Sequence, residues 1–226
     1  MPSPHNGANQ KTDGLRVVRG ALPASIVVAP IVVASLACSS AAFAEDRSYG
    51  RFDGDLALAG ELALVASEDG PALGVRATAS YLTMAGAYAE YDEGLDRQGE
   101  SMARRLSGGI ELRPLFLARF VGDLETGAPL FDLWLDSLGF GLGTFITWHP
   151  AMACAENCQR QGLEFAGRMA LPLLARANGP FVALRGGARF EMGTPATGSL
   201  DETVAFGALS IGFEGLIPTG LLRRAP

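Results

Sequence analysis

The sequence predicts an all-β fold, an antiparallel up-and-down transmembrane β-barrel of eight strands, seven of which are clearly marked. From about Phe52 to Pro218 the side chains alternate with period two, which is the period of a β-strand. In residues 54–66, leucines occupy one face, whereas alanines, Asp55 and Glu61 occupy the other. An export signal precedes this region. No later apolar run approaches the roughly 18 residues of a membrane helix, so a membrane crossing requires a closed barrel.

Residues 1–44 have the features of a cleavable signal peptide. Basic residues precede a short apolar run from Ala24 to Ala37, and Ala42-Phe43-Ala44 places small residues where a signal peptidase reads them. We expect cleavage before Glu45, which leaves residues 45–226 as a single β-barrel domain. Two alternatives are weaker. The apolar run is short and contains Pro30, which disfavours an uncleaved anchor, and Ser35 replaces the aliphatic residue expected of a lipoprotein signal before Cys38.

Cleavage makes the chain more acidic. Residues 1–44 hold three of the 18 basic and one of the 24 acidic residues, so the remaining 182 residues carry a net charge of −8. They contain no lysine. A chain of this composition has no basic patch that could follow a phosphate backbone, and nucleic acid is excluded as a partner.

Seven segments alternate clearly enough to be assigned as strands. They are residues 52–66, 72–91, 103–118, 133–148, 162–176, 180–192 and 203–217. Their lengths suit tilted strands that need about 9–11 residues to cross the hydrocarbon layer. In the last three, one parity is strongly apolar. It consists of Leu163, Phe165, Met169 and Leu171, then Val182, Leu184, Ala188 and Phe190, then Ala205, Leu209, Ile211 and Phe213.

Short and long connections alternate between these segments, as they do in membrane barrels. If Asn178-Gly179 is a periplasmic turn, then residues 92–101, 149–161 and 193–202 face outside and the C-terminus lies inside.

An eighth strand is expected because bacterial single-chain barrels have an even number of strands. The ambiguous region is Pro114 to Ser137, where Pro129 to Leu135 fits either a strand or a short helix against the periplasmic rim. Residues 72–91 are also long enough to hide a bulge, because Leu82 and Met84 fall on the polar parity.

Charged side chains gather on the parity that faces the lumen. The acids are Asp53, Asp55, Glu61, Glu111, Glu164, Glu191 and Glu214, and the arginines are Arg76, Arg105, Arg113, Arg168, Arg185 and Arg189. Interleaved arginines and carboxylates can satisfy one another, and Gly141, Gly143 and Gly187 leave room for such long side chains. The interior of an eight-stranded barrel is just wide enough for side chains to fill, so we expect a plugged, non-conducting lumen.

The alternative to a membrane barrel is a soluble sandwich whose charged face meets water and whose Leu/Phe face is its core. The lack of lysine and the long strands disfavour it. In the barrel, aromatic residues near strand ends would form interfacial girdles. These residues are Tyr81, Tyr88, Tyr91, Phe116, Phe120, Trp134 and Trp148.

Cys154 and Cys158 lie four residues apart in the turn-rich loop after Trp148. In an exported protein this spacing favours a disulfide that pins the loop. A metal site would recruit His149 and perhaps Glu156, but ligands are few and the periplasm is oxidising, so we predict no metal and no cofactor.

No catalytic constellation is recognisable. His149 is the one histidine after residue 44, and its neighbours match neither the His-x-Ser pattern of lipid A deacylases nor a Gly-x-Ser-x-Gly elbow. The carboxylates of Asp53 and Asp55 share a face because strands alternate, which is no sign of glycosidase chemistry. We therefore predict that the chain is not an enzyme.

Residues 108–117 and 133–143 read Gly-Gly-Ile-Glu-Leu-Arg-Pro-Leu-Phe-Leu and Leu-Trp-Leu-Asp-Ser-Leu-Gly-Phe-Gly-Leu-Gly. In these residues, and in the Gly/Ala/Leu-rich alternating pattern over most of residues 45–217, the chain resembles small outer-membrane β-barrel proteins of myxobacterial and proteobacterial type. The resemblance implies a place in the outer membrane of a Gram-negative bacterium, in contact with outer-membrane lipid and lipopolysaccharide and with the barrel-assembly machinery. It implies no particular activity or ligand.

Three functional hypotheses follow. A structural or interaction barrel, whose function resides in its outer loops, fits the pattern best. The second is a soluble periplasmic lipocalin-like binder of a hydrophobic ligand, which would turn its leucines and phenylalanines inward. The third is an outer-membrane lipid-modifying enzyme, which would have to use His149 as its base.

Overall fold

The computed structural model describes residues 49–51, 54–95, 102, 104–122, 124–149, 159–192 and 200–219. The predicted signal peptide, Asp53 and the cysteine pair Cys154 and Cys158 lie outside these residues.

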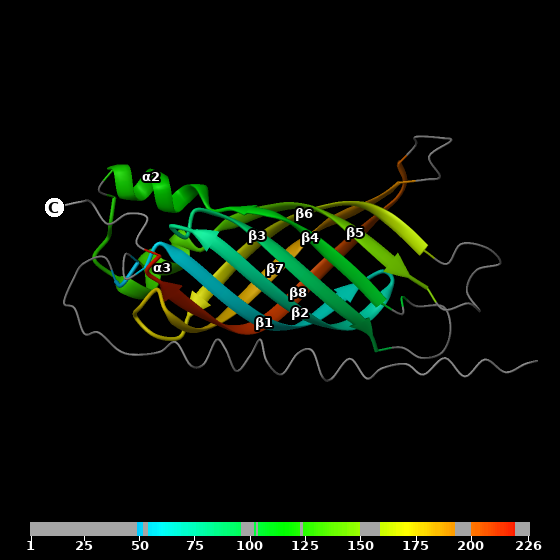
Figure 1. The fold of residues 1–226 in the computed structure, drawn as a ribbon, viewed down its shortest axis with the longest axis horizontal. Helices are drawn as coiled ribbons and strands as arrows, with labels where there is room; N and C mark the ends of the chain where they lie inside the picture. The colour runs from blue at the N-terminus through cyan, green and yellow to red at the C-terminus, as the bar shows by residue number, and fades with distance from the viewer. Residues whose placement is uncertain are drawn as a thin grey trace, which may run out of the picture.

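Eight antiparallel strands form a closed barrel in which each strand pairs with the next in sequence and β8 pairs with β1 (Figure 1). The strands are β1 (Leu56–Ser67), β2 (Gly70–Tyr81), β3 (Ala85–Gly94), β4 (Arg104–Leu112), β5 (Gly139–Trp148), β6 (Gln159–Pro172), β7 (Gly179–Met192) and β8 (Leu200–Ile217). Two helices, α2 (Pro114–Gly122) and α3 (Pro129–Asp136), connect β4 to β5. The predicted up-and-down barrel of eight strands is confirmed.

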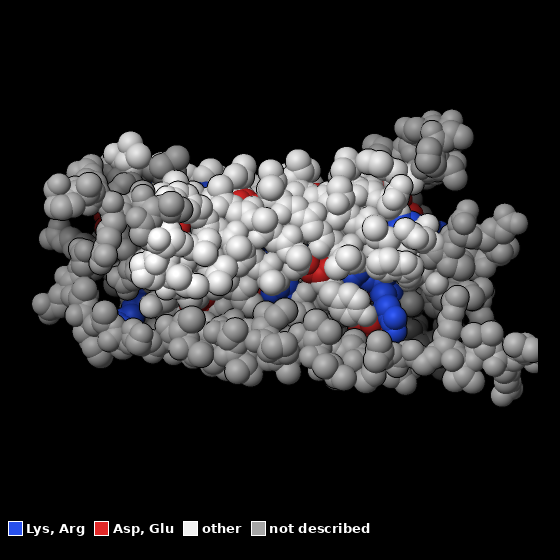
Figure 2. Space-filling view, viewed as in Figure 1, with Lys and Arg blue, Asp and Glu red and all other residues white. Residues whose placement is uncertain are grey.

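Alternation decides which side chains fill the barrel. In β1 the alanines at 57, 59 and 63 are buried with Glu61, while Leu62 and Leu64 are exposed. The other strands repeat this arrangement. Charged and small side chains point inward together with Tyr88, Phe145, Phe181 and Phe206, and most leucines and isoleucines point outward together with Phe140 and Phe165. On the face seen in Figure 2 the described part of the barrel wall is mostly uncharged, with small charged groups between the apolar side chains and the largest basic group toward one end. The polarity of the molecule is thus the reverse of that of a water-soluble barrel.

The eighth strand comes from residues 72–91, which contain a turn and not a bulge, and not from the ambiguous region Pro114 to Ser137. A three-residue turn, Leu82 to Met84, divides the segment into β2 and β3. The amide of Met84 donates to the carbonyl of Tyr81 at 3.1 Å, and the amide of Leu82 donates to the carbonyl of Asp55 at 2.8 Å. Because the turn contains no Gly, Pro, Asn or Asp, nothing in its composition signals a reversal of the chain.

Leu82 and Thr83 adopt left-handed backbone conformations, with φ of 50° and 57°. Such angles are unfavourable for a leucine and more so for a β-branched threonine. We therefore expect the double substitution Leu82→Asn with Thr83→Gly, which favours positive φ at both sites, to stabilise the barrel by about 1 kcal/mol. Equilibrium unfolding in urea checks this, with Leu82→Ala with Thr83→Ala as the control. A destabilised Asn-Gly variant would contradict the prediction.

Residues 103–118 and 133–148 are each part strand and part helix. The first is β4 as far as Leu112, after which Pro114 opens α2, and the second is the end of α3 followed by β5 from Gly139. The helical alternative for Pro129 to Leu135 is confirmed. Pro129 occupies the first turn of α3, where its missing N–H costs nothing. No helix in the described ranges is long and apolar enough to cross a membrane.

The two ends of the barrel differ. One end, called the helix end, carries α2, α3, the Leu82 to Met84 turn and residues 173–178 between β6 and β7. The opposite, loop end carries the β1–β2 turn and the connections that follow β3, β5 and β7. Short and long connections do not alternate strictly by end, because the β1–β2 turn is short and the helical connection is long.

Candidate functional site: the charged lumen

The lumen is the chemically distinctive part of the molecule. Every described charged residue that the sequence pattern placed on the inward face of a strand is buried. These residues are Asp55, Glu61, Arg76, Arg105, Glu111, Arg113, Glu164, Arg168, Arg185, Arg189, Glu191 and Glu214. Two further acids, Glu90 and Asp92 of β3, lie among them. The described lumen therefore holds eight carboxylates and six guanidinium groups.

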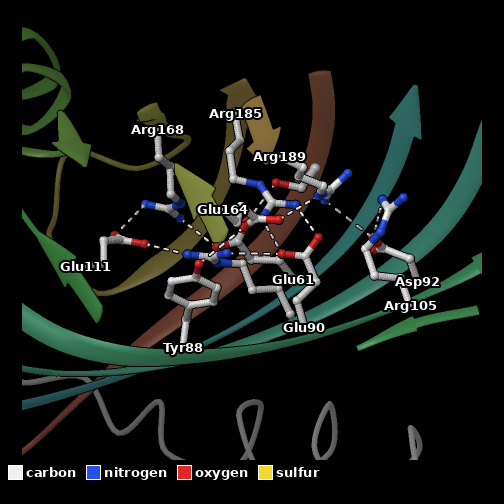
Figure 3. A network of polar contacts seen from close by, with 12 residues as sticks. Glu61, Tyr88, Glu90, Asp92, Arg105, Glu111, Glu164, Arg168, Arg185 and Arg189 are labelled. Atoms are coloured by element: carbon white, nitrogen blue, oxygen red, sulfur yellow. Dashed lines mark hydrogen bonds and ion pairs between the residues drawn. The ribbon is translucent and has the colours of Figure 1, made fainter. Parts of the chain in front are cut away.

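Glu90 is the central carboxylate of the network (Figure 3). The Arg185 guanidinium donates to both of its oxygens, and Nη1 of Arg76 donates to Oε2 at 3.0 Å. Arg185 on β7 reaches Glu90 on β3 from the opposite wall of the barrel, whereas Arg76 is the register partner of Glu90 on the adjacent strand β2. Bidentate pairs of this kind are among the strongest side-chain contacts in proteins.

A second carboxylate, Glu164 of β6, is fully buried beside this centre. Nε of Arg189 donates to its Oε2 at 2.7 Å, and the hydroxyl of Tyr88 donates to its Oε1 at 3.2 Å. Arg185 lies 3.8 Å away and so connects Glu164 to the Glu90 centre. Arg189 also stacks on Phe206, with its guanidinium carbon 3.8 Å from the ring centroid. Packing on an aromatic face stabilises a guanidinium that water cannot reach.

Toward the helix end the chain of pairs continues through Glu111 of β4. Its carboxylate accepts from Arg76 at 2.8 Å and from Arg113 at 3.2 Å. Arg113 in turn reaches Glu214 at 3.5 Å. Close to them Arg168 donates to Glu61 at 2.7 Å, and the Ser210 hydroxyl donates to the other oxygen of Glu61 at 2.7 Å.

Toward the loop end the pairs are looser. Asp92 receives no hydrogen bond from the described residues and lies 3.7 Å from both Arg105 and Arg189. Arg105 donates to Asp69 in the β1–β2 turn at 2.6 Å and to the hydroxyl of Thr147 at 3.0 Å. A continuous series of alternating acids and arginines therefore runs from Asp69 at one rim to Glu214 near the other.

Sequence reasoning missed Glu90 and Asp92, although both lie on the parity of Arg76. Reading residues 72–91 as one strand placed Asp92 in a loop. Tyr88, Glu90 and Asp92 are spaced two residues apart, and this spacing could have identified all three as residues that face the lumen.

Two of the seven aromatic residues predicted for the girdles point inward, which corrects that assignment. Tyr88 lies in the lumen with its ring 3.8 Å from the guanidinium carbon of Arg76, and Phe116 of α2 is buried. Tyr81 and Trp148 are exposed at strand ends, as a girdle requires. Tyr91 and Trp134 are half-buried, and the side chain of Phe120 lies outside the described set.

Glycines opposite Tyr88 make room for its ring. A Cβ at Gly143 would collide with the Tyr88 hydroxyl and lie 2.6 Å from the carbonyl oxygen of Gly108. We expect Gly143→Ala to destabilise the barrel by about 1–3 kcal/mol, because overpacking would displace Tyr88 from Glu164. The matched control is Gly207→Ala, since no atom lies within 4 Å of a Cβ built there. Equal unfolding free energies for the two variants would contradict this assignment.

A second group of ion pairs holds the helices at the helix end. Arg119 of α2 donates to the carboxylates of Asp132 and Asp136 of α3, and Arg51 donates to Glu125 at 2.6 Å and pairs with Asp136 at 2.8 Å. Asp132 is completely buried. Burial raises the pKa of the Asp132 carboxyl, but hydrogen bonds from the Thr126 backbone and hydroxyl and from Arg119 outweigh it and hold that pKa below its ordinary value.

The helices are anchored to the barrel wall. The amide of Ala170 on β6 donates to the Ser137 hydroxyl at 2.8 Å. A cavity of about 60 Å³ remains between this cover and the lumen, lined by Arg51 and Asp136 on one side and by Arg113, Arg168 and Glu214 on the other. It has room for a few water molecules.

The arrangement resembles a protein core built from ion pairs. Most of its acids are already engaged by arginines, and Asp55 accepts hydrogen bonds from the amide and hydroxyl of Thr219. In the described part of the chain no group of three or more His, Cys, Asp or Glu side chains is placed to hold a metal ion. What the geometry can do is hold the eight strands together from inside and fill the space through which solutes would pass.

No protein-family model matches the chain, and no curated protein is significantly similar to it. Among solved structures, it is similar to the N-terminal β-barrel domain of Pseudomonas aeruginosa OprF, with 11% identity and a TM-score of 0.42 over 71% of this chain and 98% of that one. It is also similar to Ail, the attachment invasion locus protein of Yersinia pestis, solved with the heparin analogue sucrose octasulfate. Here identity is 8% and the TM-score 0.33, over 70% of this chain and 95% of that one.

Proposed function

We propose that this protein is an outer-membrane β-barrel with a structural or interaction role, a lumen closed to ions by its charge network, and its specific contacts in the loops at the loop end. The observation that carries the proposal is the reversed polarity of the barrel. Side chains such as Leu142, Phe165 and Ile211 are about half exposed or more on the outer wall, whereas Glu164 and Arg189 are buried inside. An apolar wall of this kind is stable in contact with hydrocarbon and would aggregate in water.

This polarity disfavours the soluble alternative. A lipocalin-like binder of a hydrophobic ligand needs an apolar interior, but the described lumen is filled by ion pairs between residues such as Glu90 and Arg185. A lipid-modifying enzyme is also disfavoured. Its one candidate base after residue 44 is His149, which directly follows β5 and lies in no recognisable catalytic motif. We further propose outer-membrane lipid and lipopolysaccharide as the surroundings of the wall, and the barrel-assembly machinery as the route of insertion.

Fractionation of cells that produce the full chain tests the proposal. We expect the protein in the outer-membrane fraction, without residues 1–44, and with a gel mobility that shifts on boiling, as β-rich membrane barrels show. In planar bilayers the purified barrel is expected to give no steady conductance. Recovery of the protein in the soluble periplasmic fraction would refute the location, and stable channels would refute the closed lumen while leaving the location intact.

We also propose that a disulfide between Cys154 and Cys158 orders the loop after β5, although both cysteines lie outside the described residues. Closing so short a loop is worth at most about 1–3 kcal/mol. Thiol labelling of the denatured, unreduced mature protein is expected to modify no cysteine. Labelling of two thiols per chain would show that the pair is free.

A further inference from the structure

The α2–α3 insert, defined here as residues 114–136, has the same reversed polarity as the barrel wall. Arg119, Asp132 and Asp136 are all buried between the two helices and the barrel. Glu125, half-buried, is paired with Arg51. Each charged residue that the structure describes in the insert is therefore turned inward or engaged in an ion pair.

The outer surface of the insert is apolar. Val121, with 76% of its surface exposed, is the most open large apolar residue that the structure describes, and four further large apolar residues of the insert are also exposed. They are Leu115, Leu124, Leu130 and Phe131. A helix that faces water normally carries its charges outward and its apolar stripe inward, and here the reverse holds.

This apolar surface continues that of the barrel wall. Leu112, the last residue of β4, and Phe140, near the start of β5, are both about half exposed on the wall, and the insert connects these two strands. Figure 1 shows α2 and α3 at one end of the barrel, beside the strand ends. Phe131 packs on Trp134 with ring centroids 5.7 Å apart. Aromatic side chains of this kind are enriched where hydrocarbon meets headgroups.

We propose that the α2–α3 insert lies in the membrane interface, with exposed side chains such as Leu115, Val121 and Phe131 in the boundary between headgroups and acyl chains. Its occupant is phospholipid of the leaflet at the helix end. The proposal rests on the proposed membrane location of the barrel. It adds that the lipid-facing surface does not stop at the strands but extends over the helices that cover the lumen, so that one element both closes the barrel and sets its depth in the bilayer.

The chain contains two tryptophans, which makes the test direct. Trp148→Phe leaves Trp134 on α3 as the one fluorescent reporter of the insert. A second protein, with Trp134→Phe, Trp148→Phe and Phe165→Trp, reports from the outward face of the barrel wall. Both are reconstituted into phosphatidylcholine vesicles whose acyl chains carry bromine either near the headgroup or near the chain end.

We expect Trp134 to lose fluorescence in brominated vesicles, more to bromines near the headgroup than to those near the chain end. The Phe165→Trp reporter is expected to show the opposite order. Introducing Val121→Glu with Leu124→Glu beside the Trp134 reporter should reduce its quenching, because charge removes the insert from the apolar layer. The same pair of substitutions should leave quenching of the wall reporter unchanged.

The outcomes separate the two proposals. If the wall reporter is quenched and Trp134 is not, the insert projects into water and the inference is wrong, while the membrane barrel stands. If neither is quenched, the proposed location itself fails. If Trp134 is quenched only after the protein is diluted in the vesicles, a second copy of the chain covers this face, and the lipid assignment is again overturned.

Discussion

Replacing Arg189 by leucine is expected to destabilise the barrel by about 3–5 kcal/mol, the loss typical of a buried ion pair that is deprived of one partner. Arg189 and Glu164 are both almost completely buried, and Nε donates to the carboxylate at 2.7 Å. Without Arg189, Glu164 retains the Tyr88 hydroxyl at 3.2 Å and Arg185 at 3.8 Å. Those contacts leave a charge uncompensated where water cannot replace the lost donor. Urea unfolding in detergent micelles or lipid vesicles measures the change.

Two controls make this result specific to the lumen. Arg104→Leu makes the same replacement in an exposed ion pair, since Arg104 is half exposed and lies 3.4 Å from Glu93, and is expected to cost no more than about 1 kcal/mol. The double variant Arg189→Leu with Glu164→Leu removes both charges and should recover most of the loss, because an apolar pair can replace a buried ion pair. A loss at Arg189 no larger than that at Arg104 would count against the network as a stabilising core.

Replacing Leu184 by arginine is expected to cost about 2–4 kcal/mol in lipid, because it places a charge in the hydrocarbon layer near its middle. Leu184 points outward from β7 and is half exposed, between Met169 of β6 and Leu209 of β8. In a water-soluble barrel the same substitution on an exposed site would change stability by no more than about 0.5 kcal/mol. The measurement therefore distinguishes lipid from water as the solvent of this wall.

Leu112→Arg is the matched control for depth. Leu112 is equally exposed, but it is the last residue of β4, at the helix end. There an arginine can reach the headgroups, and the expected cost falls to about 0–1 kcal/mol. Equal losses at positions 184 and 112 would show that the effect comes from strand packing and not from the bilayer.

The missed eighth strand shows where sequence patterns stop being informative. The turn from Leu82 to Met84 is made by residues whose side chains do not favour turns, so tertiary contacts impose it, such as the hydrogen bond from the amide of Leu82 to the carbonyl of Asp55. Because the turn has three residues, Arg76 and Glu90 keep the same parity on either side of it. The polar parity is therefore the same in β2 and β3, and only Leu82 and Met84 of the turn interrupt it, so two strands look like one.

The helices between β4 and β5 escaped a clear prediction for a different reason. Short apolar runs such as Pro129 to Leu135 satisfy the periodicity of a strand and of a helix equally. Arg119 decides between them, because its bonds to Asp132 and Asp136 require those acids one helical turn apart on the same face.

The sequence by itself determined the class of fold and the side of the wall on which most charged residues lie. Successive side chains of a strand point to opposite faces, so the outward direction of Leu184 and the inward direction of Arg185 follow from their order in the chain. Only the tertiary structure decided which acid meets which arginine. Arg185 and Glu90 are 95 residues apart, and Arg168 and Glu61 are 107 residues apart. Closure of the barrel and the tilt of its strands bring these pairs together across the lumen, and no local pattern encodes either of them.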